Sequence, residues 1–548
     1  MRIDTIYTNA HFRTLDVNRP TATRLGVLGG RIVGFDEELE GIEADDIVDL
    51  GGAPALPGFH DAHHHISLTG ARLAALDLRP SKVGSLEALY DAVAHHAATL
   101  GPDEWVRGSG YDQNALGGEH PTADALDRAA AGRPVLLEHV SAHMLVANTR
   151  ALELAGFPDR RGLPAVTGGW IPVDDDGRAV GLLQEAAVEI VYRLVRPLGL
   201  EEVQRNLELA SKHAVRYGIT SATEPGIGDH AMMGNSPVDL HSYQQAVAEG
   251  RLKIRATLMP YCTTLHDVEG FRDKDWFGLD LGIRTGFGDD RLRLGPVKIL
   301  SDGSFIGRSA AMHTCYHGEP DNYGLMTFED QHLEDMITGA HQAGWTVATH
   351  AIGDAAIDQV MNAFEKAQRL APRPGARHRI EHFAFASAAQ VARAARLGIV
   401  PVPQGVFISD FGDGMREAVA DQDPDRIYRM KSLLEAGMVL PGSSDSPVSD
   451  ANPLTCIRDM VNRRTASGDV LAPAERLTVG EAVRAYTWGS AYAEGSEHSK
   501  GRLARGMLAD FVTLDRDLFE IDPATVGDAA VARTVIGGET VFDAEHDA

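Results

Sequence analysis

The feature that most constrains this chain is a repeated alternation of short apolar segments with amphipathic helical segments between residues 53 and 445. Such an alternation predicts a parallel sheet, and eight strand segments predict a closed (β/α)8 barrel with helices around it. An open, doubly wound sheet is the structural alternative. The eight expected strands are APALPGF (53–59), GITSATE (218–224), KIRATLMP (253–260), PVKIL (296–300), WTVATH (345–350), HRIEHF (378–383), IVPVPQ (399–404) and MVLPGSSD (438–445).

The two ends of the chain have a different pattern, rich in short apolar runs without helical periodicity. In residues 1–56 the pair Gly29-Gly30 separates two apolar runs, which predicts a tight hairpin, and another Gly-Gly pair occurs close to the C-terminus. Neither end can bury a sheet face alone. We therefore predict a β-sandwich domain formed by residues 1–56 and 495–548, beside a barrel domain of residues 57–494.

Residues 66–217 are too long for a single crossover between neighbouring strands. They also contain strand-like segments of their own, EWVRGSG and PVLLEHV. We interpret them as a large insertion after the first barrel strand. Because insertions at this point lie over the C-terminal face of a barrel, this one is predicted to cover the active site.

Charge and composition limit the function further. The chain has 51 Lys and Arg against 78 Asp and Glu, a formal net charge of −27, which argues against nucleic acid or an anionic membrane as a partner and leaves a small-molecule substrate. Its three cysteines are far apart in sequence, so a disulfide framework is not expected. No apolar run has the length of a signal peptide or a membrane span. We therefore expect a cytoplasmic enzyme.

Side chains that bind metals occur at the ends of several predicted strands, where the reactive groups of a (β/α)8 barrel lie. In PGFHDAHHHI (57–66), His63 and His65 are two residues apart and share one face of an extended strand, while His64 points to the other. Four imidazoles and a carboxylate are the ligands expected for zinc or a similar divalent ion. The candidate ligands at the strand ends are His63, His65, Lys298, His350, His382 and Asp445.

Lys298 is unusual in this group, because a metal ion and histidines would repel its positive charge. One solution is carboxylation of its amine by carbon dioxide, which makes an anionic carbamate that can bridge two metals. The alternative is an unmodified lysine that turns away from the site or pairs with a carboxylate such as Asp302. The local chemistry favours neither interpretation.

An ordered set of motifs covers nearly the whole chain: PGFHDAHHHI, PVKILSDGS, THAIGDAA, RIEHF and GSSDSPV. Together they resemble the amidohydrolase superfamily, and more narrowly its amidohydrolase-3 branch, which includes the N-substituted formamide deformylases. The resemblance implies a (β/α)8 barrel beside a β-sandwich, a homodimer, one or two divalent metal ions, and an N6-carboxylysine at Lys298. It also implies metal ligation by His63, His65, His350, His382 and Asp445.

This ligand set predicts a metal-dependent hydrolase of carbon–nitrogen bonds in amides, formamides or cyclic amides. A metal-activated hydroxide would attack the carbonyl, with Asp445 as general base and then general acid. Deaminases of the superfamily resemble one another in a glutamate shortly after the strand-5 histidine, but His350 is followed by Ala-Ile-Gly-Asp. The alternatives are a hydrolase or deaminase with one metal and an unmodified Lys298, and a catalytically silent relative that acts as a binding or regulatory protein.

Substrate contacts are predicted near the strand ends and within the insertion. Glu224 ends the second predicted strand, where relatives often show a His-Asp pair, and it is also a candidate metal ligand or bridge. Asp61 and Asp354 are predicted to orient histidines from behind. The candidate substrate contacts are His143, Trp170, Glu224, Arg308 and Gln404.

Overall fold

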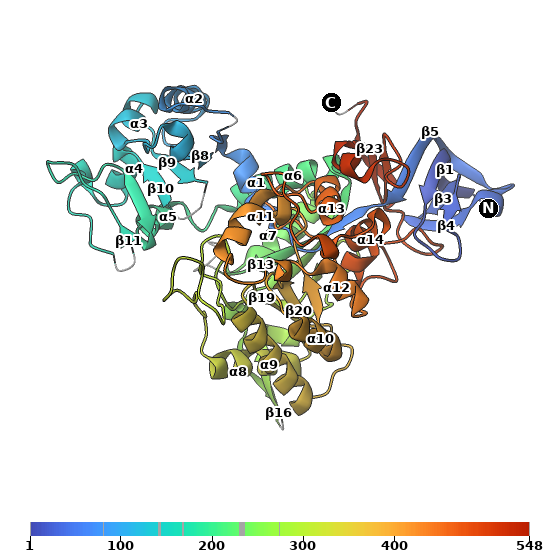
Figure 1. Cartoon of the computed structure of the whole chain (residues 1–548). Coiled ribbons are helices and arrows are strands. Elements are labelled where there is room, and N and C mark those ends of the chain that lie inside the picture. Colours follow the sequence, from blue (N-terminus) through green and yellow to red (C-terminus); the bar gives the residue numbers. More distant parts are fainter. Residues whose placement is uncertain are drawn as a thin grey trace. The chain divides into compact units, whose positions relative to one another are not determined.

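The computed structural model describes residues 2–80, 82–140, 144–166, 169–229, 236–272 and 274–546 (Figure 1). The chain forms two compact units. The first consists of Met1–Ile66, Ala210–Met233 and Pro237–Ala548, and the second of Ser67–Leu209 and Gly234–Ser236. Within the described ranges, no helix combines the length and the hydropathy that crossing a bilayer requires.

The two ends of the chain meet in one eight-stranded sheet of the first unit. Its centre is the parallel pair of β1 (Arg2–Arg13) and β5 (Glu43–Pro57), and the C-terminal strand β22 (Phe511–Leu514) pairs antiparallel with β5. β1 and β5 are long enough to carry strands of both termini in a single hydrogen-bonded sheet, and the predicted sandwich arrangement of this domain stays a prediction. The remaining strands are β2 (Thr21–Ala22), β3 (Leu25–Leu28), β4 (Arg31–Phe35), β23 (Val531–Ile536) and β24 (Glu539–Asp543).

The predicted alternation appears in the first unit as two four-stranded parallel sheets. One has the order β17-β14-β13-β6, and the other has the order β18-β19-β20-β21. A parallel bridge between Tyr261 and Lys298 links them. The strands are β6 (Phe59–Asp61), β13 (Ile219–Ile227), β14 (Arg255–Pro260), β17 (Leu292–Leu294), β18 (Val297–Leu300), β19 (Val347–Ala351), β20 (Arg379–His382) and β21 (Val400–Val402).

The prediction of a closed barrel is wrong for the described residues, whose parallel strands form two open sheets and no closed hydrogen-bonded ring. Residues 438–445, the expected eighth strand, have no regular strand structure. They still lie beside the end of β6, since Ala62 donates its N–H to the Gly442 carbonyl at 2.9 Å and Asp445 donates to the His63 carbonyl at 2.8 Å. Pro441 has no N–H to donate, and the φ of +59° at Asp445 leaves the extended range, so pairing is interrupted on both sides of Gly442.

Helices of the first unit follow the strands, as in a βα alternation. α10 (Ala388–Leu397) shows why one begins and ends where it does: Ser387 and Gln390 form a reciprocal capping box, and Gly398 closes the helix with a left-handed φ of +65°. In Figure 1, α8, α9 and α10 lie beside β19 and β20. The other helices are α7 (Asp239–Ala248), α8 (Asp330–Gln342), α9 (Asp354–Leu370), α11 (Phe407–Ala418), α12 (Met430–Glu435), α13 (Pro453–Asn462), α14 (Val479–Arg484) and α15 (Ser490–Ala493), and a short antiparallel pair is formed by β15 (His266–Phe271) and β16 (Lys274–Gly278).

The second unit has a sheet and a core of its own. Its six strands have the order β11-β12-β10-β9-β8-β7, and buried Leu126, Val135 and Val146 belong to its core. Its predicted position over the active site stays a prediction. Its elements are β7 (Leu76–Asp77), α2 (Leu86–Thr99), β8 (Val106–Tyr111), α3 (Ala123–Ala129), β9 (Val135–His139), β10 (Met144–Ala147), α4 (Thr149–Leu154), β11 (Gly169–Trp170), β12 (Leu182–Glu185) and α5 (Glu189–Val195), and its boundaries fall within α1 (Ile66–Ala74) and α6 (Leu200–Arg216).

A buried histidine pair beside β19 and β20 makes the first unit sensitive to acid. His378 Nδ1 accepts the backbone N–H of Val347 at 3.0 Å, and its other nitrogen donates to His341 Nδ1 at 2.8 Å. His341 donates its remaining N–H to the Ala371 carbonyl at 2.6 Å. Desolvation by burial lowers the pKa of both histidines. The folded protein therefore binds fewer protons than the unfolded chain once the pH is below about 6.5.

We expect the free energy of unfolding to fall as the pH drops below about 6.5, by up to about 1.4 kcal/mol per pH unit for each of the two histidines. His378→Asn keeps an acceptor oxygen for Val347 and removes one titrating group, so this slope should become shallower in the variant. Urea unfolding followed by circular dichroism between about pH 7 and 5 measures both slopes. Equal slopes in the two proteins would contradict the assignment.

Candidate metal centre

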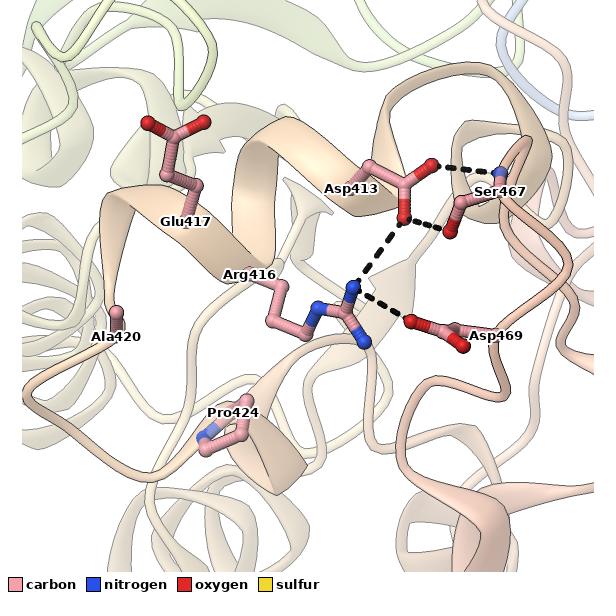
Figure 2. Close-up of a pocket in the computed structure, with 7 residues that line it drawn as sticks. All are labelled: Asp413, Arg416, Glu417, Ala420, Pro424, Ser467 and Asp469. Carbon is pink, nitrogen blue, oxygen red and sulfur yellow. Dashed lines mark hydrogen bonds and ion pairs between the residues drawn. The ribbon is translucent and has the colours of Figure 1, made fainter.

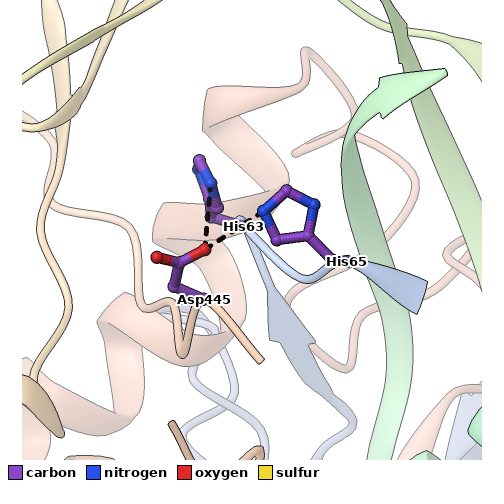
Figure 3. Close-up of side chains that lie close together, drawn as sticks. All are labelled: His63, His65 and Asp445. Carbon is purple, nitrogen blue, oxygen red and sulfur yellow. Dashed lines mark ion pairs between the residues drawn. The ribbon is translucent and has the colours of Figure 1, made fainter. Parts of the chain in front are cut away.

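Three predicted ligands meet at one point of the first unit. His63 Nε2 lies 3.4 Å and His65 Nε2 3.3 Å from the same oxygen, Oδ1 of Asp445 (Figure 3). One ligand atom of each residue lies within 4.8 Å of the other two. His63 and His65 follow the C-terminal end of β6, and Asp445 lies in the irregular segment beside it. Two imidazoles and a carboxylate thus converge as a divalent metal requires.

Asp61 supports this convergence from behind. Its carboxylate accepts the backbone N–H of His63 and of Ser444, both at 3.1 Å, and the Ser444 hydroxyl at 2.5 Å. One side chain therefore ties the two ligand-bearing segments together. His64 Nδ1 lies 3.2 Å from the second oxygen of Asp61, so His64 is turned away from Asp445.

His350 and His382 extend the cluster from neighbouring strands. Their ring centroids are 4.5 Å apart, and the His382 ring is 5.2 Å from that of His63. In the sheet register His350 pairs with Glu381, so strict alternation along β20 would turn His382 to the opposite face. The φ of +70° at His382 departs from the strand conformation and allows its ring to join the others.

Each of these two histidines has one nitrogen occupied and one left for a ligand. His382 Nδ1 contacts Gln404 Oε1 at 2.7 Å, whereas His350 Nε2 contacts the Gly303 carbonyl at 3.0 Å and Asp302 at 3.2 Å. These acceptors fix the tautomer by taking one N–H and leave the other nitrogen with its lone pair. The donor set therefore fits a divalent cation such as zinc.

Electrostatics of the cluster agree with a cation site. Burial lowers the pKa of His382 to about 3, which keeps its imidazole neutral. Although burial opposes it, His63 and His65 hold the pKa of Asp445 below its usual range. His65 differs, because the carboxylates of Asp445 and Glu224 outweigh burial and raise its pKa to about 9. A cation bound there must displace the His65 proton.

Lys298 is buried on β18, and in the sheet register it aligns with Ala348 and Arg379 on the neighbouring strands. Burial lowers the pKa of its amine to about 8, although the carboxylates of Glu381 and Asp445 act in the opposite direction. Asp302, the alternative partner, instead accepts the backbone N–H groups of Ile352 and Gly353 at 3.0 and 2.9 Å.

With this geometry in place, comparison with known proteins assigns the family. Residues 46–542 match the sequence model of the amidohydrolase family. The chain belongs to the amidohydrolase family. The expected resemblance is thereby confirmed.

Several relatives of this amidohydrolase-family chain are similar over nearly their whole length. Putative amidohydrolase YtcJ of Bacillus subtilis (strain 168) is 30% identical over 92% of this chain and 92% of its own. The N-substituted formamide deformylase of Arthrobacter pascens is 29% identical over 98% of this chain and 97% of its own. Among solved structures, an uncharacterized metal-dependent hydrolase from Pyrococcus horikoshii OT3 superposes with a TM-score of 0.78 at 26% identity, over 95% of this chain and 99% of its own.

The candidate substrate contacts lie in different surroundings. Gln404 Oε1 contacts His382, and its amide donates to Ser443 Oγ at 3.1 Å, so Gln404 is placed to orient a predicted ligand. Arg308 is bound to Glu319 at 2.6 Å and to the His317 carbonyl at 3.0 Å. Trp170 is an exposed residue of the second unit. His143 lies outside the described residues.

Three acidic residues near the histidines have partners that the sequence did not indicate. Asp354 was expected to orient a histidine ring, but it accepts the backbone N–H of His313 at 2.8 Å and pairs with Arg426 at 2.7 Å. Asp302 is the carboxylate that faces His350. Glu381 was not singled out, yet it contacts His63 Nδ1 directly. A signal was present in RIEHF, where Glu381 lies next to His382 and two residues after Arg379 in a strand that is buried throughout.

A shallow pocket of about 680 Å³ lies elsewhere on the first unit, along α11 (Figure 2). Arg416 on its wall lies 2.8 Å from Asp469 and 3.6 Å from Asp413. Asp413 also accepts the N–H and the hydroxyl of Ser467 at 2.8 and 2.7 Å. These charged groups pair with one another, and none of the candidate metal ligands lines the pocket.

Proposed function

We propose that this chain hydrolyses carbon–nitrogen bonds of amides, formamides or cyclic amides with a divalent metal held by the histidine cluster. The observation that carries the proposal is the approach of His63 Nε2 and His65 Nε2 to one oxygen of Asp445, with His350 and His382 beside them. Membership of the amidohydrolase family supports hydrolysis. The similarity to an N-substituted formamide deformylase supports a carbon–nitrogen bond as the target.

The proposed ligands are the four histidines, Asp445 and Lys298. When bound, a divalent cation such as zinc supplies Lewis acidity, which lowers the pKa of water and polarises a carbonyl. The lowered pKa of Lys298 increases the fraction of its amine that is uncharged near neutral pH, and the uncharged amine is the form that reacts with carbon dioxide. This supports carboxylation of Lys298, and the resulting carbamate is the group proposed to bridge two ions.

Asp445 is proposed to carry the proton in this reaction. Its Oδ1 faces the two imidazoles, which leaves Oδ2 for proton transfer. With its pKa held low, Asp445 is ionised and can accept a proton from the attacking water. It then delivers that proton to the leaving nitrogen, so one carboxylate acts as general base and general acid in turn.

A substrate panel tests the function. N-substituted formamides, N-acyl compounds and cyclic amides are offered to the zinc-loaded protein and to the chelated protein, and release of the amine or acid is measured. We expect hydrolysis of at least one class, loss of activity on chelation and recovery with zinc. A metal-loaded protein that is inert toward the amides, and toward esters and lactones, would contradict the proposal and favour a binding protein.

The metal content of the purified protein tests the number of ions. About two ions per chain are expected if a carboxylated Lys298 bridges them, and Lys298→Ala should then retain about one. Mass spectrometry of the intact protein under non-denaturing conditions also measures the added carboxyl group. A wild-type protein that reproducibly holds a single ion would favour the mononuclear hydrolase with an unmodified lysine.

A further inference from the structure

The Nδ1 nitrogens of His63 and His65 each face a glutamate from another strand. Glu381 Oε2, on β20, hydrogen-bonds His63 Nδ1. Glu224 Oε1, on β13, lies 3.5 Å from His65 Nδ1, which is buried and has no aligned hydrogen-bond partner in the described residues. The opposite nitrogens of both rings point to Asp445. Each ring therefore lies between two carboxylates, with Nδ1 toward a glutamate and Nε2 toward Asp445.

We propose that Glu381 and Glu224 are positioning residues that hold the His63 and His65 rings by Nδ1 and so present both Nε2 atoms to the metal. This inference rests on the proposed metal-dependent function. A carboxylate that accepts the Nδ1–H of a histidine fixes the tautomer with the lone pair on Nε2 and makes the ring a better ligand. Neither glutamate touches the reacting atoms in this role.

Glu381 is itself held in a rigid arrangement. Arg379 donates from Nε to Glu381 Oε1 and from Nη2 to Glu381 Oε2, both at 2.8 Å, and Nη2 also donates to the Ala62 carbonyl at 2.8 Å. Arg379 and Glu381 are completely buried. The guanidinium therefore fixes the carboxylate and at the same time binds the backbone just before His63. This chain of contacts joins β20 to the end of β6.

Glu224 is held from a helix. Tyr243, on α7, donates its hydroxyl to Glu224 Oε2 at 2.7 Å, which leaves Oε1 toward His65. Both side chains are buried. Because the His65–Glu224 contact is longer and less well aligned than the His63–Glu381 contact, Glu381 should contribute more to metal affinity than Glu224.

The test replaces each carboxylate by its neutral isostere and measures zinc affinity by competition with a chromogenic chelator. Glu381→Gln is expected to raise the dissociation constant about 100-fold and Glu224→Gln about 10-fold, the range seen when such outer partners of a metal ligand are removed. The visible absorption of the cobalt-loaded protein should shift in both variants, because the ligand field changes with ring orientation. A purely structural role would leave that spectrum unchanged.

The matched control is Glu494→Gln. Glu494 is a buried glutamate that lies 3.3 Å from Nε2 of His60 on β6, so it repeats the carboxylate–imidazole contact without facing a predicted ligand. Urea unfolding of the metal-free proteins reports the structural cost of every substitution. The control is expected to lose stability while keeping the wild-type zinc affinity and cobalt spectrum.

The inference would be overturned if both Glu381→Gln and Glu224→Gln kept the wild-type zinc affinity and cobalt spectrum. It would also be overturned if Glu494→Gln lost as much zinc affinity as these two variants. If Glu381→Gln does not fold, zinc affinity and the cobalt spectrum are measured for Glu224→Gln and Tyr243→Phe instead. Tyr243→Phe removes only the hydroxyl that donates to Glu224. A wild-type protein that binds no zinc would refute the metal-dependent function itself. If the wild type instead binds zinc tightly and the variants bind it equally well, only the positioning role of the glutamates is refuted.

Discussion

Asp445→Asn should lower kcat for the best amide substrate by about 1,000-fold, within the range that general acid–base catalysis contributes. Asparagine can still present an oxygen to His63 and His65, but its amide cannot accept the proton of the attacking water. The substitution therefore removes the proposed proton carrier with little change in shape. Steady-state kinetics of the zinc-loaded variant measure the loss, and the zinc content of the same sample separates it from loss of metal.

The control for Asp445→Asn is Asp421→Asn, which neutralises an exposed aspartate that pairs with His317 at 2.6 Å. We expect its kcat to match that of the wild type. If Asp445→Asn, loaded with metal, also kept the wild-type kcat, Asp445 would be a ligand alone. Another group would then have to move the proton.

Lys500→Met should lower the free energy of unfolding by about 3–5 kcal/mol, the cost of leaving a buried charge without its partner. Lys500 Nζ lies 2.7 Å from Glu494 Oε1 and donates to Ser221 Oγ at 3.0 Å. Glu494 is fully buried and also accepts the hydroxyl of Thr257 at 2.5 Å. This ion pair connects the segment before β22 to β13 and β14. Urea unfolding at neutral pH measures the change.

Two comparisons isolate the contribution of the unpaired buried charge to the free energy of unfolding. The double variant Lys500→Met with Glu494→Gln removes both charges and should recover part of the loss, since no ion then remains unpaired. Lys431→Met removes a cation that pairs with Glu481 at 2.6 Å on a part-exposed surface, and it should lower the free energy of unfolding far less than Lys500→Met does. Equal losses in the two single lysine variants would show that burial does not govern the Lys500 contribution.

The parallel strands could be predicted along the chain because a strand buried on both faces leaves a short continuous apolar run. β19 and β20 occupy the segments predicted at 345–350 and 378–383, with ends that differ by one or two residues. The eighth segment shows the limit of this pattern. Its apolar residues indicated a strand, but a hydropathy pattern does not reveal that Pro441 and the positive φ of Asp445 interrupt pairing.

The candidate ligands could be named for a similar reason. Histidines two residues apart after a strand share a face, and this periodicity alone separated His63 and His65 from His64. Their outer partners could not be named in this way. Gln404, predicted as a substrate contact, contacts His382, and Asp302, which the sequence suggested only as a partner of Lys298, faces His350.

By itself, the sequence determined the family, the alternating order of strands and helices, and the candidate ligands at the strand ends. Each of these can be identified from residue types, local spacings or the order of motifs along the chain. Only the tertiary structure decided which carboxylate faces which imidazole: Glu381 reaches His63 across 318 positions, and Ser444 reaches Asp61 across 383. Such contacts depend on strand register and on the backbone conformation at single residues such as His382, and neither leaves a periodic signal in the sequence.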